Sequence, residues 1–136
     1  MPVSKEKVKE QIRKVGKFHK WFVGKELRAL PRLMDEDEEI GFLTSGYDGH
    51  GNTVLVVATN QRLMILDSDV LYGSDDRIFP YSKINSIRGQ RGLFFGTLRI
   101  STAGVSGDDV VIRWISKSDI ARIIPVVSRY CAGSRG

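Results

Sequence analysis

The stretch that decides the fold of this chain reads Val57-Ala58-Thr59-Asn60-Gln61-Arg62-Leu63-Met64-Ile65-Leu66. Two apolar runs flank the pair Asn60-Gln61, and the β-branched residues among them favour extended backbone. Asn tolerates the positive φ that a two-residue hairpin turn requires. We therefore predict a β-hairpin whose strands are Thr53 to Thr59 and Arg62 to Asp67.

Five further strands are expected on either side of this hairpin, and two of them show period-two alternation. In one, Leu98 and Ile100 share a face; in the other, Val110, Ile112 and Trp114 are expected to share a face. The expected strands are Glu39 to Tyr47, Asp76 to Phe79, Ile84 to Arg88, Gly96 to Thr102 and Asp109 to Ile115.

A C-terminal amphipathic helix is predicted to follow the last strand. Ser116 and Asp119 have the spacing of a helix N-terminal capping box. Pro125 should kink the helix, because proline donates no backbone hydrogen bond. The segment 132–136 is expected to be a flexible tail. The apolar stripe that should close the open end of the sheet consists of Ile120, Ile123, Ile124, Val127 and Cys131.

Seven short strands followed by one helix is an order that resembles the pleckstrin-homology-like fold. Thr59-Asn60-Gln61-Arg62-Leu63 resembles the "TNxRL" hairpin of bacterial pleckstrin-homology-like domains, the YokE-like group. The segments 78–87 and 92–96 resemble the motifs that follow it. The resemblance implies an α+β fold, a pleckstrin-homology-like seven-stranded β-barrel or sandwich capped by a C-terminal α-helix. It also implies ring-like oligomers.

The charge of the chain is unevenly distributed along its length. Residues 1–34 hold ten basic and three acidic side chains, a net of +7, whereas the remaining 102 residues hold 11 and 13, a net of −2. Such asymmetry suggests two parts. We expect a basic helical N-terminal extension at 1–34, a pleckstrin-homology-like domain at 35–131 and the tail at 132–136.

The N-terminal extension carries the first set of candidate contact residues. Basic residues recur every four positions and aromatic residues gather near its end, which is typical of a basic amphipathic helix. Its apolar face could pack on its own barrel, on a neighbouring subunit or on lipid, and these alternatives stay open. The candidate membrane or partner contacts are Lys5, Lys9, Arg13, Lys17, Phe18, Trp21 and Phe22.

The acidic run after the extension is the second candidate contact, an edge between subunits made of Asp35, Glu36, Asp37, Glu38 and Glu39. Its charge is complementary to that of the N-terminal extension, so a head-to-tail contact between copies would form rings or filaments. Arg62, which opens a strand, is expected to pair with this run. The first hairpin loop, 47–52, contains no Lys or Arg, which argues against phosphoinositide binding there.

We find no pattern typical of an enzyme. Cys131 lies on the apolar stripe, His50 is flanked by glycines, and the glycine-rich segment 89–96 lacks the P-loop pattern. No spacing typical of a metal site occurs, and we expect no catalytic residue, metal, cofactor or small-molecule substrate.

We therefore predict a cytoplasmic, non-catalytic binding or scaffold module that self-assembles or binds another protein. The alternative is peripheral attachment to the anionic inner face of the membrane through the N-terminal extension. Non-specific nucleic-acid contact by the same extension is a weaker alternative, because the rest of the chain is net negative.

Overall fold

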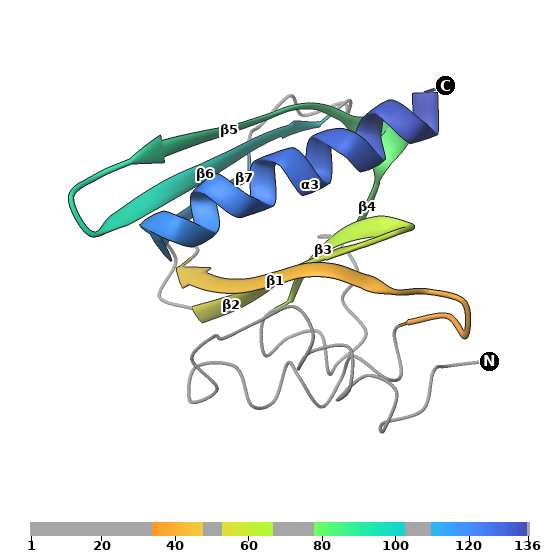
Figure 1. The fold of residues 1–136 in the computed structure, drawn as a ribbon, viewed down its shortest axis with the longest axis horizontal. Coiled ribbons are helices and arrows are strands. Elements are labelled where there is room, and N and C mark those ends of the chain that lie inside the picture. The colour runs from red at the N-terminus through yellow and green to blue at the C-terminus, as the bar shows by residue number, and fades with distance from the viewer. Residues whose placement is uncertain (1–33, 48–52, 67–77, 103–109, 136) are drawn as a thin grey trace.

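The computed structural model describes residues 34–47, 53–66, 78–102 and 110–135, and the expected N-terminal helix lies outside them. Seven strands and one long helix make up these residues (Figure 1). A short 3₁₀ turn, η3 (Tyr81–Lys83), follows β4, which ends at Pro80. The strands are β1 (Ile40–Tyr47), β2 (Thr53–Thr59), β3 (Arg62–Leu66), β4 (Ile78–Pro80), β5 (Ile84–Arg91), β6 (Phe95–Thr102) and β7 (Val110–Ser116), and the helix is α3 (Lys117–Arg135).

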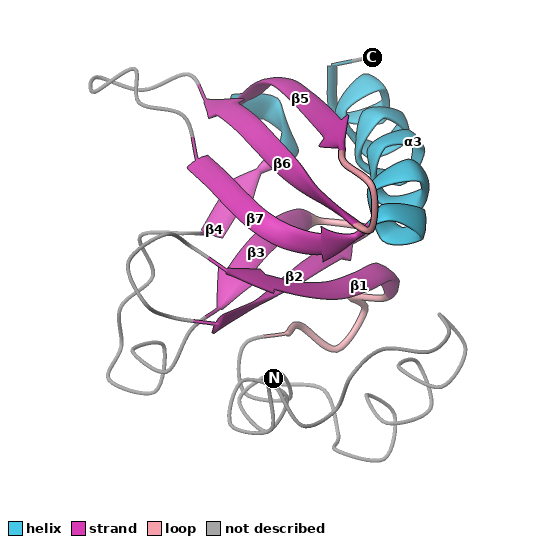
Figure 2. Ribbon diagram, turned by 90° about the vertical axis from the view of Figure 1, so that its left-hand side faces the viewer, coloured by secondary structure: helices cyan, strands magenta, loops and turns pink. Residues whose placement is uncertain are grey.

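The strands form one antiparallel sheet in the order β4-β3-β2-β1-β7-β6-β5. β1 and β7 pair only at Tyr47 and Arg113, so the sheet divides there into a β1–β4 layer and a β5–β7 layer (Figure 2). The predicted hairpin is confirmed, with Ala58 opposite Leu63 across the Asn60-Gln61 turn. These elements confirm the predicted pleckstrin-homology-like architecture.

The core lies between the two layers and under α3. Leu98, Ile100, Ile112 and Ile115 are fully buried in it, and they join Val54, Val56 and other residues of β2 and β3. β2 and β3 are buried on both faces, which explains why their sequences are continuous apolar runs rather than alternating ones.

The helix α3 packs on the core through the predicted stripe: Ile120, Ile123, Val127 and Cys131 are buried, and Ile124 is partly buried. A Cβ atom at Gly89 would lie 2.6 Å from Cγ2 of Ile120, so the helix approaches β5 closely at this glycine. The helix runs unbroken through Pro125 to Arg135, so it extends into the segment that we expected to be a flexible tail.

The start of α3 is fixed to the sheet. The Asp119 N–H donates to Ser116 Oγ at 3.3 Å, so the predicted N-terminal cap is present. The Asp119 carboxylate, however, accepts a hydrogen bond from Thr44 Oγ1 at 2.7 Å. Asp119 therefore ties the helix to β1.

The predicted alternation of β7 is wrong at Trp114. Ile112 and Ile115 are both buried, whereas Trp114 is 66% exposed and has a φ of 60°. The register with β6 shifts between Gly96 and Leu98, where the partners move from Ile115 to Ile112. This β-bulge adds one residue to β7 and turns the Trp114 ring outward, where it stacks on Tyr47 with ring centroids 5.0 Å apart.

Candidate binding surfaces

The acidic segment, Asp35 to Glu39, begins with a turn that buries one of its carboxylates. The Glu38 N–H donates to the Asp35 carbonyl oxygen at 3.1 Å, and the Asp35 N–H donates to Glu38 Oε1 at 3.0 Å. Glu38 is 0% exposed. The turn directs this side chain toward the β2–β3 hairpin and leaves the other four acidic side chains exposed.

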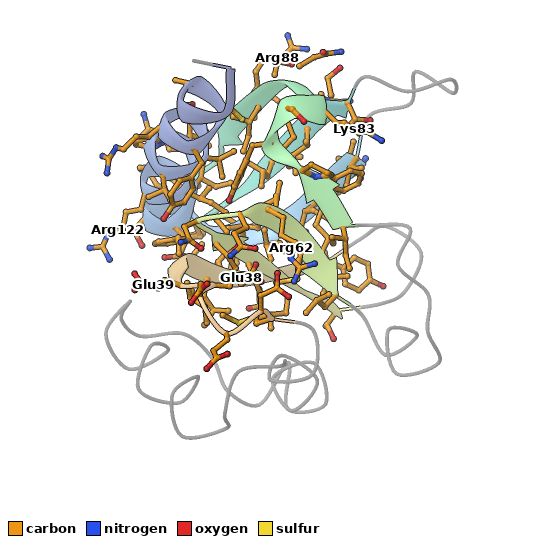
Figure 3. The ribbon with its side chains drawn as sticks, turned by 90° about the vertical axis from the view of Figure 1, so that its right-hand side faces the viewer. Glu38, Glu39, Arg62, Lys83, Arg88 and Arg122 are labelled. Atoms are coloured by element: carbon orange, nitrogen blue, oxygen red, sulfur yellow. The ribbon has the colours of Figure 1, made fainter. Side chains whose placement is uncertain are left out.

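Glu38 and Arg62 form the ion pair that the sequence predicts between the acidic segment and the first residue of β3 (Figure 3). Arg62 Nη2 lies 2.8 Å from Glu38 Oε1, and Arg62 Nε donates to Glu38 Oε2 at 3.0 Å. The contact is therefore bidentate, the strong geometry for a guanidinium and a carboxylate.

A hydroxyl network extends this ion pair into the sheet. Thr59 Oγ1 donates to Glu38 Oε2 and accepts from the Arg62 N–H at 3.1 Å. The Tyr81 hydroxyl donates to the carbonyl oxygens of Thr59 and Arg62, the latter at 3.0 Å. The network links the acidic segment, the β2–β3 turn and η3.

The environment of the network shifts the pKa of three groups. Burial opposes ionisation of Glu38, but hydrogen bonds from Arg62, Thr59 and the Asp35 N–H outweigh it and lower its pKa. The hydrogen bond to Glu38 raises the pKa of Arg62, and burial raises that of Tyr81. All three groups keep their ordinary protonation states at neutral pH, and their polar atoms are engaged with one another. The network therefore ties the acidic segment, the β2–β3 turn and η3 into the fold.

The outer surface of the β5–β7 layer has the opposite charge. Leu98 and Ile100 point into the core, so Arg99 between them points outward, and Arg88 lies directly opposite it on β5. Arg113 is exposed on β7. We call Arg88, Arg99 and Arg113 the basic face. Like charges directly opposite each other on neighbouring strands are unfavourable for the sheet.

Among the residues that the structure describes, the basic face belongs to two segments that contain no acidic residue. The described residues 78–102 and 110–118 contain no Asp or Glu, and they hold six basic residues, Lys83, Arg88, Arg91, Arg99, Arg113 and Lys117. Figure 3 shows Glu38 and Glu39 at one end of the domain, with Arg62 and Arg122 nearby, and Lys83 and Arg88 at the other end. The net charge of the domain conceals this separation.

The turn between β5 and β6 carries three exposed apolar side chains, which we call the hairpin tip. Leu93 is 80% exposed, Phe94 72% and Phe95 56%. The sequence places three consecutive apolar residues between Gly92 and Gly96, and this pattern, read above only as a family-like motif, could have indicated an exposed apolar surface. The hairpin tip lies at the far end of β5 and β6 in Figure 1, beside the start of α3.

The remaining candidate residues are placed as follows. Cys131 is a buried thiol, and no group of three or more potential metal ligands occurs among the described residues. Of the described helices, none is both long enough and apolar enough to cross a bilayer. The candidate contacts Lys5, Lys9, Arg13, Lys17, Phe18, Trp21 and Phe22, together with His50 and the first hairpin loop, lie outside the described residues.

Comparison with known protein families matches residues 34–129 to the family described as Bacterial PH domain. The match covers more than half of the chain and spans all seven strands and most of α3. The chain belongs to the bacterial PH domain family. This confirms the resemblance drawn from the hairpin and the segments 78–87 and 92–96, while membership in the YokE-like group stays a prediction. A search of curated proteins finds no match.

Family membership gives the general class of role. PH-like domains are, in general, non-catalytic modules that mediate interactions with proteins or lipids. Among the described residues of this bacterial PH domain, surfaces that suit such a role include the four exposed residues of the acidic segment, the basic face and the hairpin tip.

Proposed function

We propose that this bacterial PH domain is a non-catalytic scaffold module that self-assembles head to tail. The observation that carries the proposal is the separation of charge within the domain. The acidic segment exposes Asp35, Glu36, Asp37 and Glu39 beside β1, and the basic face exposes arginines on the β5–β7 layer. Two unlike surfaces on one molecule make a heterologous contact, which closes into a ring or continues as a filament.

The proposal modifies the contact expected from the sequence. That expectation paired the acidic segment with the basic N-terminal extension of a neighbour, and it included Glu38. Glu38 is buried against Arg62 and Thr59, so it contributes to the fold of its own chain and not to a contact between chains. The basic face offers the acidic segment a partner surface within the folded domain.

Charge reversal on each surface tests the assembly. One variant combines Asp37→Lys with Glu39→Lys, and the other combines Arg88→Glu with Arg113→Glu; all four side chains are exposed. We expect the wild-type chain to exceed the monomer mass at low salt by light scattering and each variant to be a monomer. An equimolar mixture of the two variants should regain mass, because their charges are again complementary. A monomeric wild-type chain would refute the proposal.

A shortened chain that lacks the N-terminal extension distinguishes a contact made by the basic face from a contact made by the extension. The shortened chain should begin at Met34, because Met34 is 1% exposed and its removal would disturb the packing. If the basic face makes the contact, this chain assembles as the full chain does. If only the full chain assembles, the extension makes the contact and the basic face does not.

Peripheral attachment to an anionic membrane through the N-terminal extension is the second candidate function. The observation that favours it is the net charge of +7 over residues 1–34, combined with the aromatic residues Phe18, Trp21 and Phe22. Changing Lys5, Lys9, Arg13 and Lys17 to Glu should abolish sedimentation with anionic vesicles. Retention on DNA or RNA that falls steeply with added salt would instead favour non-specific nucleic-acid contact by the same extension.

A further inference from the structure

The hairpin tip is an unusual place for large apolar side chains. Leu93, Phe94 and Phe95 are consecutive, and each is more than half exposed. Turn positions ordinarily hold small or polar residues, and burying an aliphatic or aromatic side chain away from water is worth a substantial free energy. Burial of the hairpin tip away from water would therefore be favourable.

Two backbone carbonyl groups at the turn accept hydrogen bonds from within the protein. The Gly92 N–H donates to the Phe95 carbonyl oxygen at 2.7 Å, and the Lys117 N–H donates to the Phe94 carbonyl oxygen at 3.3 Å. These bonds hold the turn against the start of α3 and use two carbonyl groups that would otherwise require water. A turn with satisfied backbone groups enters an apolar environment at a lower cost than an open loop.

Basic side chains surround the hairpin tip. Arg91 immediately precedes the turn, and Lys117 is bonded to it through its backbone; both side chains are exposed. The first acidic residue after Lys117 is Asp119, whose carboxylate accepts a hydrogen bond from Thr44. Long basic side chains can remain at the level of lipid phosphates while the apolar residues beside them insert more deeply.

The size of the apolar patch suits a membrane better than a protein partner. Aromatic side chains bury about 200 Å² each, so three side chains fall short of the roughly 800 Å² per partner that a stable protein interface buries. Shallow insertion into lipid has no such threshold, because it adds apolar burial to the attraction between basic residues and anionic headgroups.

We propose that the β5–β6 hairpin is a membrane-insertion element, in which Leu93, Phe94 and Phe95 enter the headgroup–acyl boundary of an anionic bilayer and Arg91 and Lys117 contact lipid phosphates. The site consists of other residues than the first hairpin loop and the N-terminal extension. The proposal does not depend on self-assembly, because the hairpin tip and the basic face consist of different residues.

Sedimentation of the full-length protein with vesicles tests this element. The vesicles are phosphatidylcholine with and without phosphatidylglycerol, and the variant combines Leu93→Ser with Phe94→Ser. We expect partitioning onto the anionic vesicles to weaken about tenfold or more, since two large apolar side chains no longer insert. The matched control, Leu93→Met with Phe94→Leu, keeps the apolar character and should bind like the wild-type protein.

A second variant tests the basic residues. Arg91→Gln with Lys117→Gln should also weaken binding, roughly tenfold, and added salt should reduce this difference. Thermal unfolding of every variant should match that of the wild-type protein, because the changed side chains are exposed.

Three results would overturn the proposal. The first is a wild-type protein that does not bind anionic vesicles. The second is a Leu93→Ser and Phe94→Ser variant that binds as tightly as the wild-type protein, which would assign membrane binding to the N-terminal extension. The third is a Leu93→Ser and Phe94→Ser variant that keeps vesicle binding but no longer self-associates in solution, which would assign the hairpin tip to a contact between copies.

Discussion

The β1–β3 strands and the β5–β7 strands of this domain use charged residues in opposite ways. Beside β1–β3, Glu38 is fully buried, and the ion pair with Arg62 is completed by Thr59 and by the Asp35 N–H. On β5–β7, Arg88 and Arg113 are exposed, and no acidic residue lies in the described residues 78–102. A charged residue therefore supports the fold in the first region and offers a contact surface in the second.

Removing the buried carboxylate is the strongest way to test this difference. Glu38→Ala should lower the free energy of unfolding by about 3 kcal/mol, because it removes the bidentate partner of the Arg62 guanidinium and one hydrogen bond of the Thr59 hydroxyl. Urea unfolding measures this loss.

Two control variants test whether the stability of the domain depends on the buried acid beside β1–β3 and not on exposed charged residues. Glu39→Ala removes an exposed acid next to Glu38, and Arg88→Ala removes an exposed cation of the basic face. Each should change the free energy of unfolding by less than about 0.5 kcal/mol. If Arg88→Ala destabilises the domain as much as Glu38→Ala, the arginine belongs to the fold and the comparison fails.

Acid should weaken the β1–β3 region through Glu38. Because its pKa in the folded protein is lowered from 4.5, Glu38 contributes stability above that pH, and the contribution is lost as the pH falls through the lowered pKa. Glu38→Gln has no such group, so the stability difference between the wild-type protein and this variant should shrink on acidification. Unfolding curves recorded from pH 7 to pH 3 would contradict this expectation if the difference stayed constant.

The bulge in β7 provides a smaller test within the β5–β7 region. Trp114 has a φ of 60°, a conformation that costs a residue other than glycine about 1 kcal/mol. Trp114→Gly and Trp114→Ala both remove the stacking on Tyr47, but only the glycine relieves the backbone. The glycine variant should be about 1 kcal/mol more stable than the alanine variant in thermal unfolding. Equal stability would show that the backbone carries no strain there.

The sequence was sufficient to predict features that depend on local pattern. The hairpin around Asn60-Gln61, the stripe of α3 and the pairing of Arg62 with the acidic segment follow from spacing and charge. The choice of Glu38 among five neighbouring acids could not be predicted, because it depends on the turn that bonds Glu38 to Asp35.

The surfaces of the β5–β7 layer were harder to predict for a different reason. A period-two pattern assumes an uninterrupted strand. Because β7 contains one extra residue, this pattern predicted the wrong face for Trp114. The net charge of −2 over residues 35–136 sums the acidic segment, the six basic residues on and beside the β5–β7 layer and the other charged residues of that range. Only the three-dimensional arrangement shows that Glu38 and Glu39 lie away from Lys83 and Arg88.

The position of α3 after all seven strands in the sequence has a consequence for synthesis on the ribosome. All seven strands are complete at Ser116, yet Ile120, Ile123 and Val127, which finish the core, are translated afterwards. Until they emerge, the nascent chain exposes the apolar surface that α3 later covers, and exposed apolar surface of this kind favours aggregation. We expect a chain that stops at Ser116 to be degraded or bound by chaperones, although it contains every strand of the sheet.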